Sequence, residues 1–559
     1  MSYLQKIKIV YGNTKKKILI NVLILNLINT CLEVFNIALL LPLFSVILNK
    51  TFELQRLNIL PNFFFNLNYY EQIISTIIVI IIVYIIKVYF FVFGNYYLSS
   101  QVYLIGADIG DRLVKKYLLS PLSYHIYNSS STLIRNVYKE VNELIDNNIR
   151  PLFYLVNDCL VLFAILFFLL LVDLNKFLIL IFFSFFIILL FYFLRKFFIR
   201  YGSKRQFYDE TRLKHLQNLL KSIREIKIYQ REEFFLEKFS YDNRKNYEYA
   251  AKNLFLSSLP RVIIETIVLV LTVFSLLFLL ESNNGIKNID IGTYALFLAA
   301  IVRFIPLISK INTSINSLRY GLPTLNVLSD EISKNNQLIT RTDNSSNDHI
   351  FIKSLEFKNV SFAYDLKKKF ILDKLNFKIS KGDLVKIIGK SGSGKTTLTN
   401  LIIGFLEPTN GEILLDNVFI KGNHNKWISK IGIVSQSIFL LNDTIENNIV
   451  FGSLIDKHRL KNVLNAVNLT KEDGFKSSNF IGENGSNLSG GEIQRIAIAR
   501  ALYNDSDLII FDEPTSNLDN DNTKLIESLI KSLKKTKTII VITHDKNLFQ
   551  DSEVVINLN

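Results

Sequence analysis

A glycine-rich run, Gly389–Thr396, has the composition and spacing of a phosphate-binding loop. It reads Gly-Lys-Ser-Gly-Ser-Gly-Lys-Thr and follows the apolar run Leu384–Ile388, so we expect a strand, a tight loop and a helix. Glycines let backbone N–H groups point at phosphates, with the positive end of the helix behind them. Lys395 adds positive charge, and the Thr396 hydroxyl can bind Mg²⁺. An ordinary glycine-rich turn is the alternative. The predicted nucleotide-binding residues are Gly389, Lys390, Ser391, Gly392, Ser393, Gly394, Lys395, Thr396 and Thr397.

Two carboxylates follow a second apolar strand further along the chain. The run Leu508–Phe511 ends in Asp512 and Glu513, which we expect beside the phosphate loop. Asp512 can hold Mg²⁺ through water, and Glu513 can polarise the water that attacks the terminal phosphate. Together the loop and the carboxylates indicate hydrolysis of a nucleoside triphosphate.

The residues between the loop and the carboxylates carry a family resemblance. Leu488–Arg495 reads Leu-Ser-Gly-Gly-Glu-Ile-Gln-Arg and resembles the signature motif of ATP-binding cassette proteins. The other parts of that family's pattern are also present, at Tyr364, Gln436, Asp519 and His544. The resemblance implies an α/β P-loop nucleotide-binding domain with ATP and Mg²⁺ as cofactors.

The same resemblance implies a role for each matching residue. Tyr364 stacks on adenine, Gln436 contacts Mg²⁺ and water, and His544 donates a hydrogen bond to the γ-phosphate, while Asp519 belongs to the ATP site. A strand aromatic is the alternative for Tyr364. A structural histidine is the alternative for His544, although its place after the apolar strand Thr538–Ile542 argues against that.

A second anion-binding helix end is expected at the signature motif. Ser489, Gly490 and Gly491 open a helix, so their N–H groups are available to an anion. In the resembled family this end faces the phosphate loop of another cassette, with ATP between the two. One cassette per chain then implies a dimer, and a homodimer is the simplest form because every catalytic position matches the active pattern.

Composition adds a membrane part to the cassette. The 559 residues are 49% hydrophobic and only 20% charged, which excludes a wholly soluble protein. The net charge of +15 is spread through connecting segments, so we expect no nucleic-acid partner. Cys31 and Cys159 lie in apolar runs and cannot form a disulfide framework or a zinc site.

Six apolar stretches have the length of membrane helices, about 20 residues or more. They predict a six-helix transmembrane domain of the exporter type within residues 1–325, a linker at 326–349 and the cassette at 350–559. The first stretch is a retained helix rather than a signal peptide. The six stretches are 18–48, 73–99, 150–172, 176–194, 254–281 and 292–319.

Lysine and arginine asymmetry sets the orientation. The connections 101–148 and 195–252 are rich in basic residues, so they and the cassette lie in the cytoplasm. Their helical patterning predicts stalks with tips at 119–127 and 217–227, the coupling helices of the family; a solvated hairpin is the alternative. The apolar segment 49–72 predicts a helix on the outer bilayer surface, or ordinary packing against the bundle.

Four cations in the apolar stretches are candidate substrate contacts, because ionisable residues are costly inside a membrane. They are Lys87, Arg261, Arg303 and Lys310. Arg303 and Lys310 share a helix face, and all four would suit a phosphate or pyrophosphate group. As alternatives, Arg261 pairs with Glu265 and Lys87 reaches the membrane surface.

The layout of the whole chain resembles bacterial half-transporters that flip lipid-linked oligosaccharides. Glu33, the external segment, Ser258–Arg261 and the basic sixth helix carry this resemblance. It implies ATP-driven movement of a polyprenyl-pyrophosphate oligosaccharide, or a similar anionic amphiphile, across the bacterial inner membrane. A multidrug, peptide or lipid exporter of the same family is one alternative. A soluble cassette protein and an ATP-gated channel are alternatives from other classes.

Overall fold

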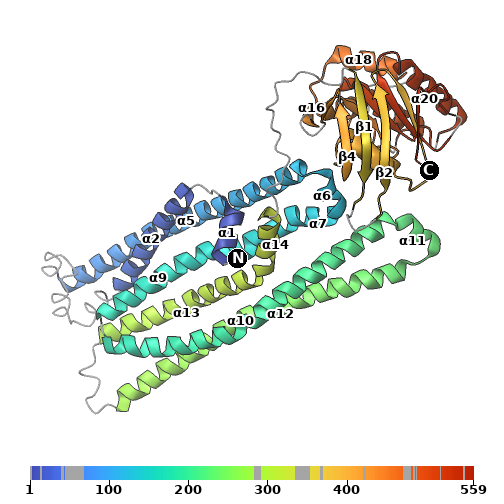
Figure 1. Ribbon diagram of the computed structural model, residues 1–559. Helices are drawn as coiled ribbons and strands as arrows, with labels where there is room; N and C mark the ends of the chain where they lie inside the picture. The colour runs from blue at the N-terminus through green and yellow to red at the C-terminus, as the bar shows by residue number, and fades with distance from the viewer. Residues whose placement is uncertain are drawn as a thin grey trace. The chain divides into compact units, whose positions relative to one another are not determined.

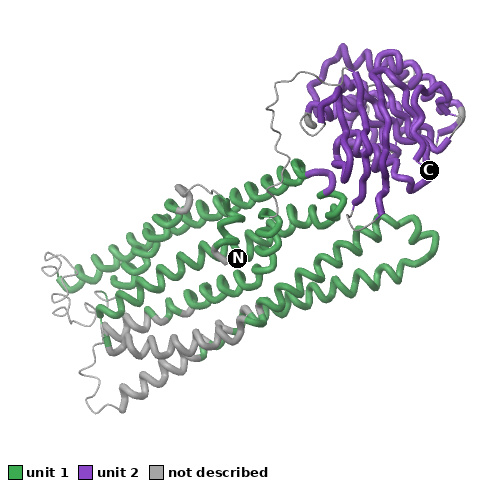
Figure 2. The backbone as a smooth tube through the Cα atoms, viewed as in Figure 1, with its two compact units in different colours: residues 1–120, 124–338 green, residues 121–123, 339–559 purple. Residues whose placement is uncertain are grey.

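The computed structural model describes residues 3–12, 16–39, 43, 68–172, 174–281, 291–333, 353–364, 369–419, 424–469, 480–482, 485, 487–516, 518–545 and 548–558. The chain divides into two compact units, which Figure 2 distinguishes by colour. The first comprises residues 1–120 and 124–338, and the second residues 121–123 and 339–559.

Six long helices that run side by side make up most of the first unit (Figure 1). Five of them contain a whole predicted membrane stretch, and α2 contains residues 18–38 of the first stretch, so the six-helix prediction is confirmed for the described residues. Three described segments are long and apolar enough to cross a membrane, namely Ile20–Ala38, Tyr69–Leu119 and Ser130–Val172. The six helices are α2 (Lys16–Ala38), α5 (Tyr69–Leu119), α9 (Arg150–Val172), α10 (Leu174–Lys221), α12 (Glu232–Glu281) and α13 (Ile291–Tyr320).

Three of these helices are longer than a membrane requires. α5, α10 and α12 have 51, 48 and 50 residues. At 1.5 Å per residue such a helix is about 75 Å long, against about 30 Å of hydrocarbon. The predicted stalks are therefore continuous extensions of the membrane helices. Short helices lie at the two predicted tips, α6 (Leu122–Tyr127) and α11 (Ile223–Tyr229).

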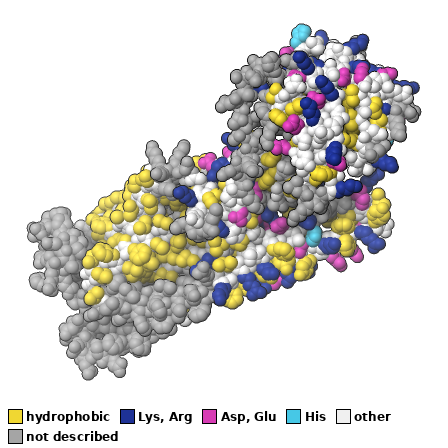
Figure 3. Space-filling view, in the orientation of Figure 1, with side chains coloured by type: hydrophobic (Ala, Val, Ile, Leu, Met, Phe, Trp, Pro, Cys, Tyr) yellow, Lys and Arg dark blue, Asp and Glu magenta, His cyan; other side chains and the backbone are white. Residues whose placement is uncertain are grey.

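The surface of the first unit also differs between the membrane helices and the stalks. Along the first half of α5, side chains such as Ile78, Ile82 and Phe93 are exposed and apolar, as lipid-facing residues should be. In the stalks, ion pairs such as Arg205–Glu143 and Arg212–Asp209 join or brace the helices. Figure 3 shows hydrophobic side chains on one part of this unit's described surface and charged ones on another.

Short elements complete the first unit. α14 follows α13 after a turn at Gly321 and covers the first residues of the range expected for the linker. Residues 334–349 of that range, and residues 49–67 of the predicted external segment, lie outside the described residues. The short elements are α1 (Tyr3–Tyr11), α7 (Ser130–Arg135), the π-helical turns η2 (Asn136–Glu140) and η3 (Ile145–Ile149), α8 (Val141–Leu144) and α14 (Leu322–Ser333).

The second unit contains two sheets, which Figure 1 shows with their flanking helices. An antiparallel sheet has the order β2-β1-β4-β5, and a parallel sheet has the order β6-β7-β8-β3-β9. The strands are β1 (Ser354–Phe362), β2 (Leu372–Ser380), β3 (Leu384–Ile388), β4 (Asn410–Leu415), β5 (Val418–Phe419), β6 (Ile431–Val434), β7 (Leu508–Asp512), β8 (Thr538–Thr543) and β9 (Val554–Asn557). The helices are α15 (Lys395–Ile403), α16 (His424–Ile428), α17 (Ile445–Val450), α18 (Lys457–Ala466), α19 (Gly490–Tyr503) and α20 (Asn520–Leu533).

Apolar clusters cover both faces of the parallel sheet. One includes Trp427 and the inner face of α15, and the other includes α17 and α19. All six residues of β8 are buried for this reason. Strands covered on both faces read as unbroken apolar runs, which is why β3, β7 and β8 could be predicted from the sequence.

Candidate ATP site and intramembrane charges

The register of the parallel sheet brings the cassette motifs to one edge. Ile388, at the end of β3, pairs with Thr543 of β8, and Asp512 of β7 pairs with Ile542. All these strands run in the same direction. The phosphate loop after β3, the carboxylates at the end of β7 and His544 after β8 therefore leave the sheet side by side.

The phosphate loop has the expected backbone. Gly392 and Gly394 have φ angles of 82° and 96°, in the left-handed region where side chains are disfavoured. A Cβ on Gly394 would also lie 2.9 Å from a methyl group of Leu372. Lys395, the first residue of α15, donates a hydrogen bond from Nζ to the Gly389 carbonyl at 2.8 Å. The loop therefore needs glycine at these two positions.

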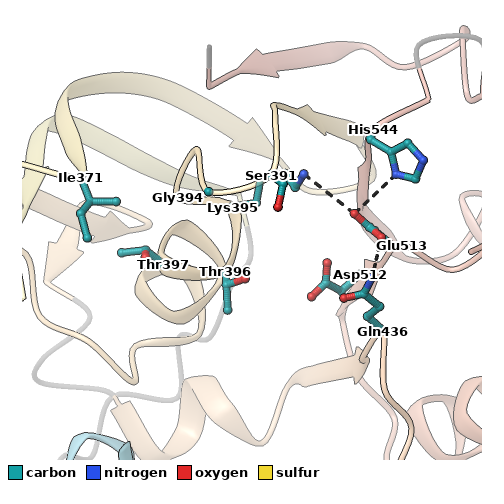
Figure 4. Close-up of a pocket in the computed structure, with 11 residues that line it drawn as sticks. Ile371, Ser391, Gly394, Lys395, Thr396, Thr397, Gln436, Asp512, Glu513 and His544 are labelled. Atoms are coloured by element: carbon teal, nitrogen blue, oxygen red, sulfur yellow. Dashed lines mark hydrogen bonds and ion pairs between the residues drawn. The ribbon is translucent and has the colours of Figure 1, made fainter. Parts of the chain in front are cut away.

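A cavity of about 520 Å³ lies against this loop. Figure 4 shows that its residues come from the loop, from α15 and from the ends of the strands. The lining residues are Ile371, Ser391, Gly392, Gly394, Lys395, Thr396, Thr397, Gln436, Asp512, Glu513 and His544. Most residues predicted for phosphate and Mg²⁺ are thus in one place, and Ile371, which sequence reasoning missed, joins them.

Glu513 lies at the centre of the polar groups in this cavity (Figure 4). Its carboxylate accepts a hydrogen bond from Gln436 Nε2 at 2.7 Å. Lys395 Nζ and His544 Nδ1 lie 3.9 and 3.5 Å from the same carboxylate. Glu513 has a φ of 50°, an uncommon conformation for a residue with a side chain, and such strain is found at functional sites.

Asp512, the neighbouring carboxylate, is electrostatically perturbed. Burial raises the pKa of Asp512, the negative charge of Glu513 raises it further, and Lys395 opposes both. The Thr396 hydroxyl, the Asp512 carboxylate and the Gln436 amide oxygen are hard oxygen donors of the kind that Mg²⁺ prefers. These three residues line the same cavity, so the donor set fits the ion.

The signature motif forms a capped helix end, as predicted. Ser489 is the N-cap of α19, and its hydroxyl accepts the backbone N–H of Glu492. The Glu492 carboxylate accepts the N–H of Ser489 in return, at 2.6 Å. Neither Ser489, Gly490 nor Gly491 lines the described cavity. The predicted helix start is thus formed, and it does not contribute to the cavity beside the phosphate loop of its own chain.

The remaining predicted cassette residues are not among those that line the cavity. Tyr364 is 42% exposed, and its hydroxyl lies 3.4 Å from the hydroxyl of Thr397, which does line the cavity. Asp519 precedes α20 and accepts a hydrogen bond from Asn522 at 2.6 Å. Lys390 is exposed, and the buried Ser393 hydroxyl has no hydrogen-bond partner among the described residues.

Two of the four intramembrane cations, Lys87 and Arg303, form ion pairs with the same carboxylate. Glu33 of α2 forms ion pairs with Lys87 of α5 and, at 3.4 Å, with Arg303 of α13. Lys310 is exposed on the same helix and interacts electrostatically with Asp158, a buried residue of α9. The side chain of Arg261 lies outside the described residues. Sequence reasoning linked Glu33 to a family layout but missed its pairing.

Comparisons with known proteins agree with this architecture. The family model described as the ABC transporter transmembrane region matches residues 19–305, and the model described as ABC transporter matches residues 372–516. A solved bacterial Atm1-family ABC exporter with ATP bound has a TM-score of 0.79 at 20% identity, covering 98% of this chain and 94% of that one. That likeness shows a common fold.

Curated relatives match a smaller part of the chain. An ATP-dependent lipid A-core flippase of Paraburkholderia xenovorans is 40% identical over 198 residues, which are 34% of this chain and 33% of the relative. The protein of the same name from Haemophilus influenzae is 40% identical over 212 residues, 36% of each chain. The matched region therefore spans about a third of the length of these relatives.

Proposed function

Because the chain belongs to the ABC transporter family, we propose that it is one half of a homodimeric ATP-driven translocase for lipids with anionic headgroups. The observation that carries the proposal is the combination of two sites. One is a cavity that brings together residues of the phosphate loop, two carboxylates, Gln436 and His544. The other is a set of cations on helices that cross the membrane.

The residues of the cavity support a division of roles in ATP hydrolysis. Lys395 and the loop N–H groups bind the phosphates, and Glu513 accepts a proton from the attacking water. Gln436 and His544, both close to Glu513, orient that water and the terminal phosphate. Mg²⁺, held by Thr396, Asp512 and Gln436, would neutralise charge between the phosphates.

The position of the signature motif supports a dimer. The capped N-terminus of α19 does not line the cavity of its own chain, so we assign it to ATP bound by another chain. Tyr364 would hold the adenine within the same chain. Since the chain carries both halves of such a composite site, two identical copies would complete two equivalent sites.

The exposed face of α13 supports an anionic cargo. Arg303, Lys310 and Thr313 are exposed on it, whereas Phe304 and Asn312 are buried on the other face. A cation facing lipid costs about 2.5 to 3.5 kcal/mol, so this face should border a water-filled cavity in the assembled transporter. Together with Lys87 and Arg261, these cations would contact a phosphate or pyrophosphate headgroup.

The names of the relatives support a lipid rather than a soluble cargo, because both are lipid A-core flippases by name. Within this class we favour a polyprenyl-pyrophosphate oligosaccharide. The proposed location is the bacterial inner membrane with the cassette in the cytoplasm. ATP binding would close two cassettes, and the long stalks of α5, α10 and α12 would carry the movement to the membrane helices.

Proteoliposomes with a fluorescent polyprenyl-pyrophosphate oligosaccharide test the proposal. We expect ATP-dependent movement of the probe by the wild-type protein, little by Glu513→Gln, and a reduced rate for Arg303→Ala. Lys115→Ala, which removes an exposed cation outside the predicted membrane stretches, is the matched control.

Three outcomes would contradict the proposal. Movement without ATP, or none at all, would refute a translocase for this cargo. Stimulation of ATP hydrolysis by cationic drugs but not by anionic lipids would favour a multidrug exporter. ATP-dependent ion currents in a flat bilayer would favour a channel.

A further inference from the structure

Glu33 joins three membrane helices through two cations. Oε2 of its carboxylate pairs with Lys87 Nζ on α5, and Oε1 lies 3.4 Å from Arg303 Nη1 on α13. Each oxygen of the carboxylate therefore serves a different helix. In an apolar environment charged side chains are stable only when they are paired. We therefore take this arrangement to be the state of the transporter without cargo.

The two ion pairs differ in accessibility. The side chains of Lys87 and Glu33 are only 13% and 16% exposed, and their contact is the shorter one. Arg303 is 45% exposed, and its contact with Glu33 is longer. The Lys87 pair should hold Glu33 in place, while the guanidinium of Arg303 can reach another anion.

A phosphate group can replace the carboxylate on Arg303. Both groups offer two charged oxygens on one centre, and the planar fork of arginine binds either of them. A pyrophosphate carries more charge than a carboxylate and can compete for the guanidinium. A neutral headgroup cannot.

We propose that Glu33 is a specificity-determining counter-ion, which an anionic headgroup displaces from Arg303 while Lys87 retains it. The inference rests on the proposed function and deepens it. Glu33 and two cations leave a net charge of +1 at the described triad, from two positive groups and one negative. A headgroup must therefore bind Arg303 more strongly than the Glu33 carboxylate does. Weakly charged lipids cannot do so and are excluded.

Binding of a fluorescent farnesyl pyrophosphate analogue to the full-length protein, in detergent and without ATP, tests the exchange. Glu33→Gln removes the competing charge and should tighten binding about tenfold. Glu33→Asp keeps the charge and should bind as the wild type does. Fluorescent farnesol, which lacks the anion, should show no gain with Glu33→Gln.

A double-variant cycle shows whether the gain acts through Arg303. Arg303→Gln should weaken binding, and adding Glu33→Gln to it should restore nothing. Unchanged or weaker binding by Glu33→Gln overturns the inference, as does an equal gain for farnesol or in the Arg303→Gln background. Circular dichroism of each variant shows that the helices are intact.

The transport assay separates this inference from the proposed function. ATP-driven movement of the lipid probe together with unchanged binding by Glu33→Gln would overturn the exchange alone. ATP hydrolysis without any movement of the probe would overturn the proposed function, whatever the binding data show.

Discussion

Replacing Glu513 by glutamine should abolish turnover while preserving the site. The glutamine side chain keeps an oxygen that can accept the 2.7 Å hydrogen bond from Gln436, so the local geometry should survive. It cannot accept a proton from water. It also removes the negative charge that lies 3.9 Å from Lys395 and 3.5 Å from His544, so ATP binding should be unchanged or tighter.

The size of the effect follows from the role assigned to Glu513. A positioned general base contributes about 10²- to 10⁴-fold, or about 3 to 5 kcal/mol of barrier. We therefore expect kcat at saturating ATP to fall by at least about 100-fold. Phosphate release measures kcat, and a fluorescent ATP analogue measures binding.

Glu527→Gln is the matched control for this variant. It makes the same chemical change in the same cassette, at a surface ion pair with Lys531 that lies on α20. Surface pairs contribute little, so its turnover should stay near the wild-type value. Turnover of Glu513→Gln within about tenfold of the wild type would refute Glu513 as the base. A parallel loss of ATP binding would instead indicate a structural role.

Further predictions address the dimer, the fold and the pH dependence. Lys395→Ala and Gly490→Asp should each abolish ATP hydrolysis when tested alone. An equimolar mixture reassembled into dimers should recover about a quarter of the wild-type rate, because half of the dimers are mixed and one of the two composite sites in each is intact. Phosphate release measures this rate. Trp427→Phe should lower cassette stability by about 1 to 3 kcal/mol, since the indole N–H donates to a buried carbonyl of α15 at 2.8 Å; thermal unfolding of the whole chain measures it. Mg²⁺-dependent ATP binding should be lost as the pH falls and Asp512 is protonated, and this loss should occur at a higher pH than the usual pKa of an aspartate, because burial raises the pKa of Asp512. Glu513→Gln removes a negative charge that also raises this pKa, so it should move the loss to lower pH. Nucleotide titrations across the acid range measure this shift.

The cassette could be predicted in detail because its determinants are local. The left-handed φ angles of Gly392 and Gly394 restrict those positions, so the loop leaves a readable pattern. Ser489 and Glu492 form a reciprocal cap, which fixes where α19 begins. Buried strands read as apolar runs because helices cover both faces of the sheet. Each of these rules acts within a few residues, and the structure follows them.

Ile371 shows where local rules end in the cassette. It lines the cavity because β2, on the antiparallel sheet, brings its start close to Gly394 of the loop. A single isoleucine before a strand is an ordinary apolar residue in the sequence. Only the packing of the antiparallel sheet against the loop makes it part of the site, so no sequence signal could have identified it.

The membrane unit was predictable in outline and not in its contacts. Hydropathy identifies a helix but says little about which side of it faces a neighbour when nearly every residue is apolar. Arg303 and Lys310 could be placed on one face from their spacing. The acid that pairs with Arg303 comes from another helix, 270 positions earlier in the chain, and no periodicity connects the two.

This pairing lowers the attraction that the intramembrane cations can exert on an anionic headgroup. Reading Lys87 and Arg303 as free charges overstates the attraction for an anion, because Glu33 already occupies both. The binding free energy of an incoming headgroup is only the difference between its own interaction with Arg303 and the interaction of the Glu33 carboxylate with Arg303. A small difference suits a transporter, which must release its cargo as well as bind it. The acid of this cluster should therefore influence cargo choice as strongly as its two cations do.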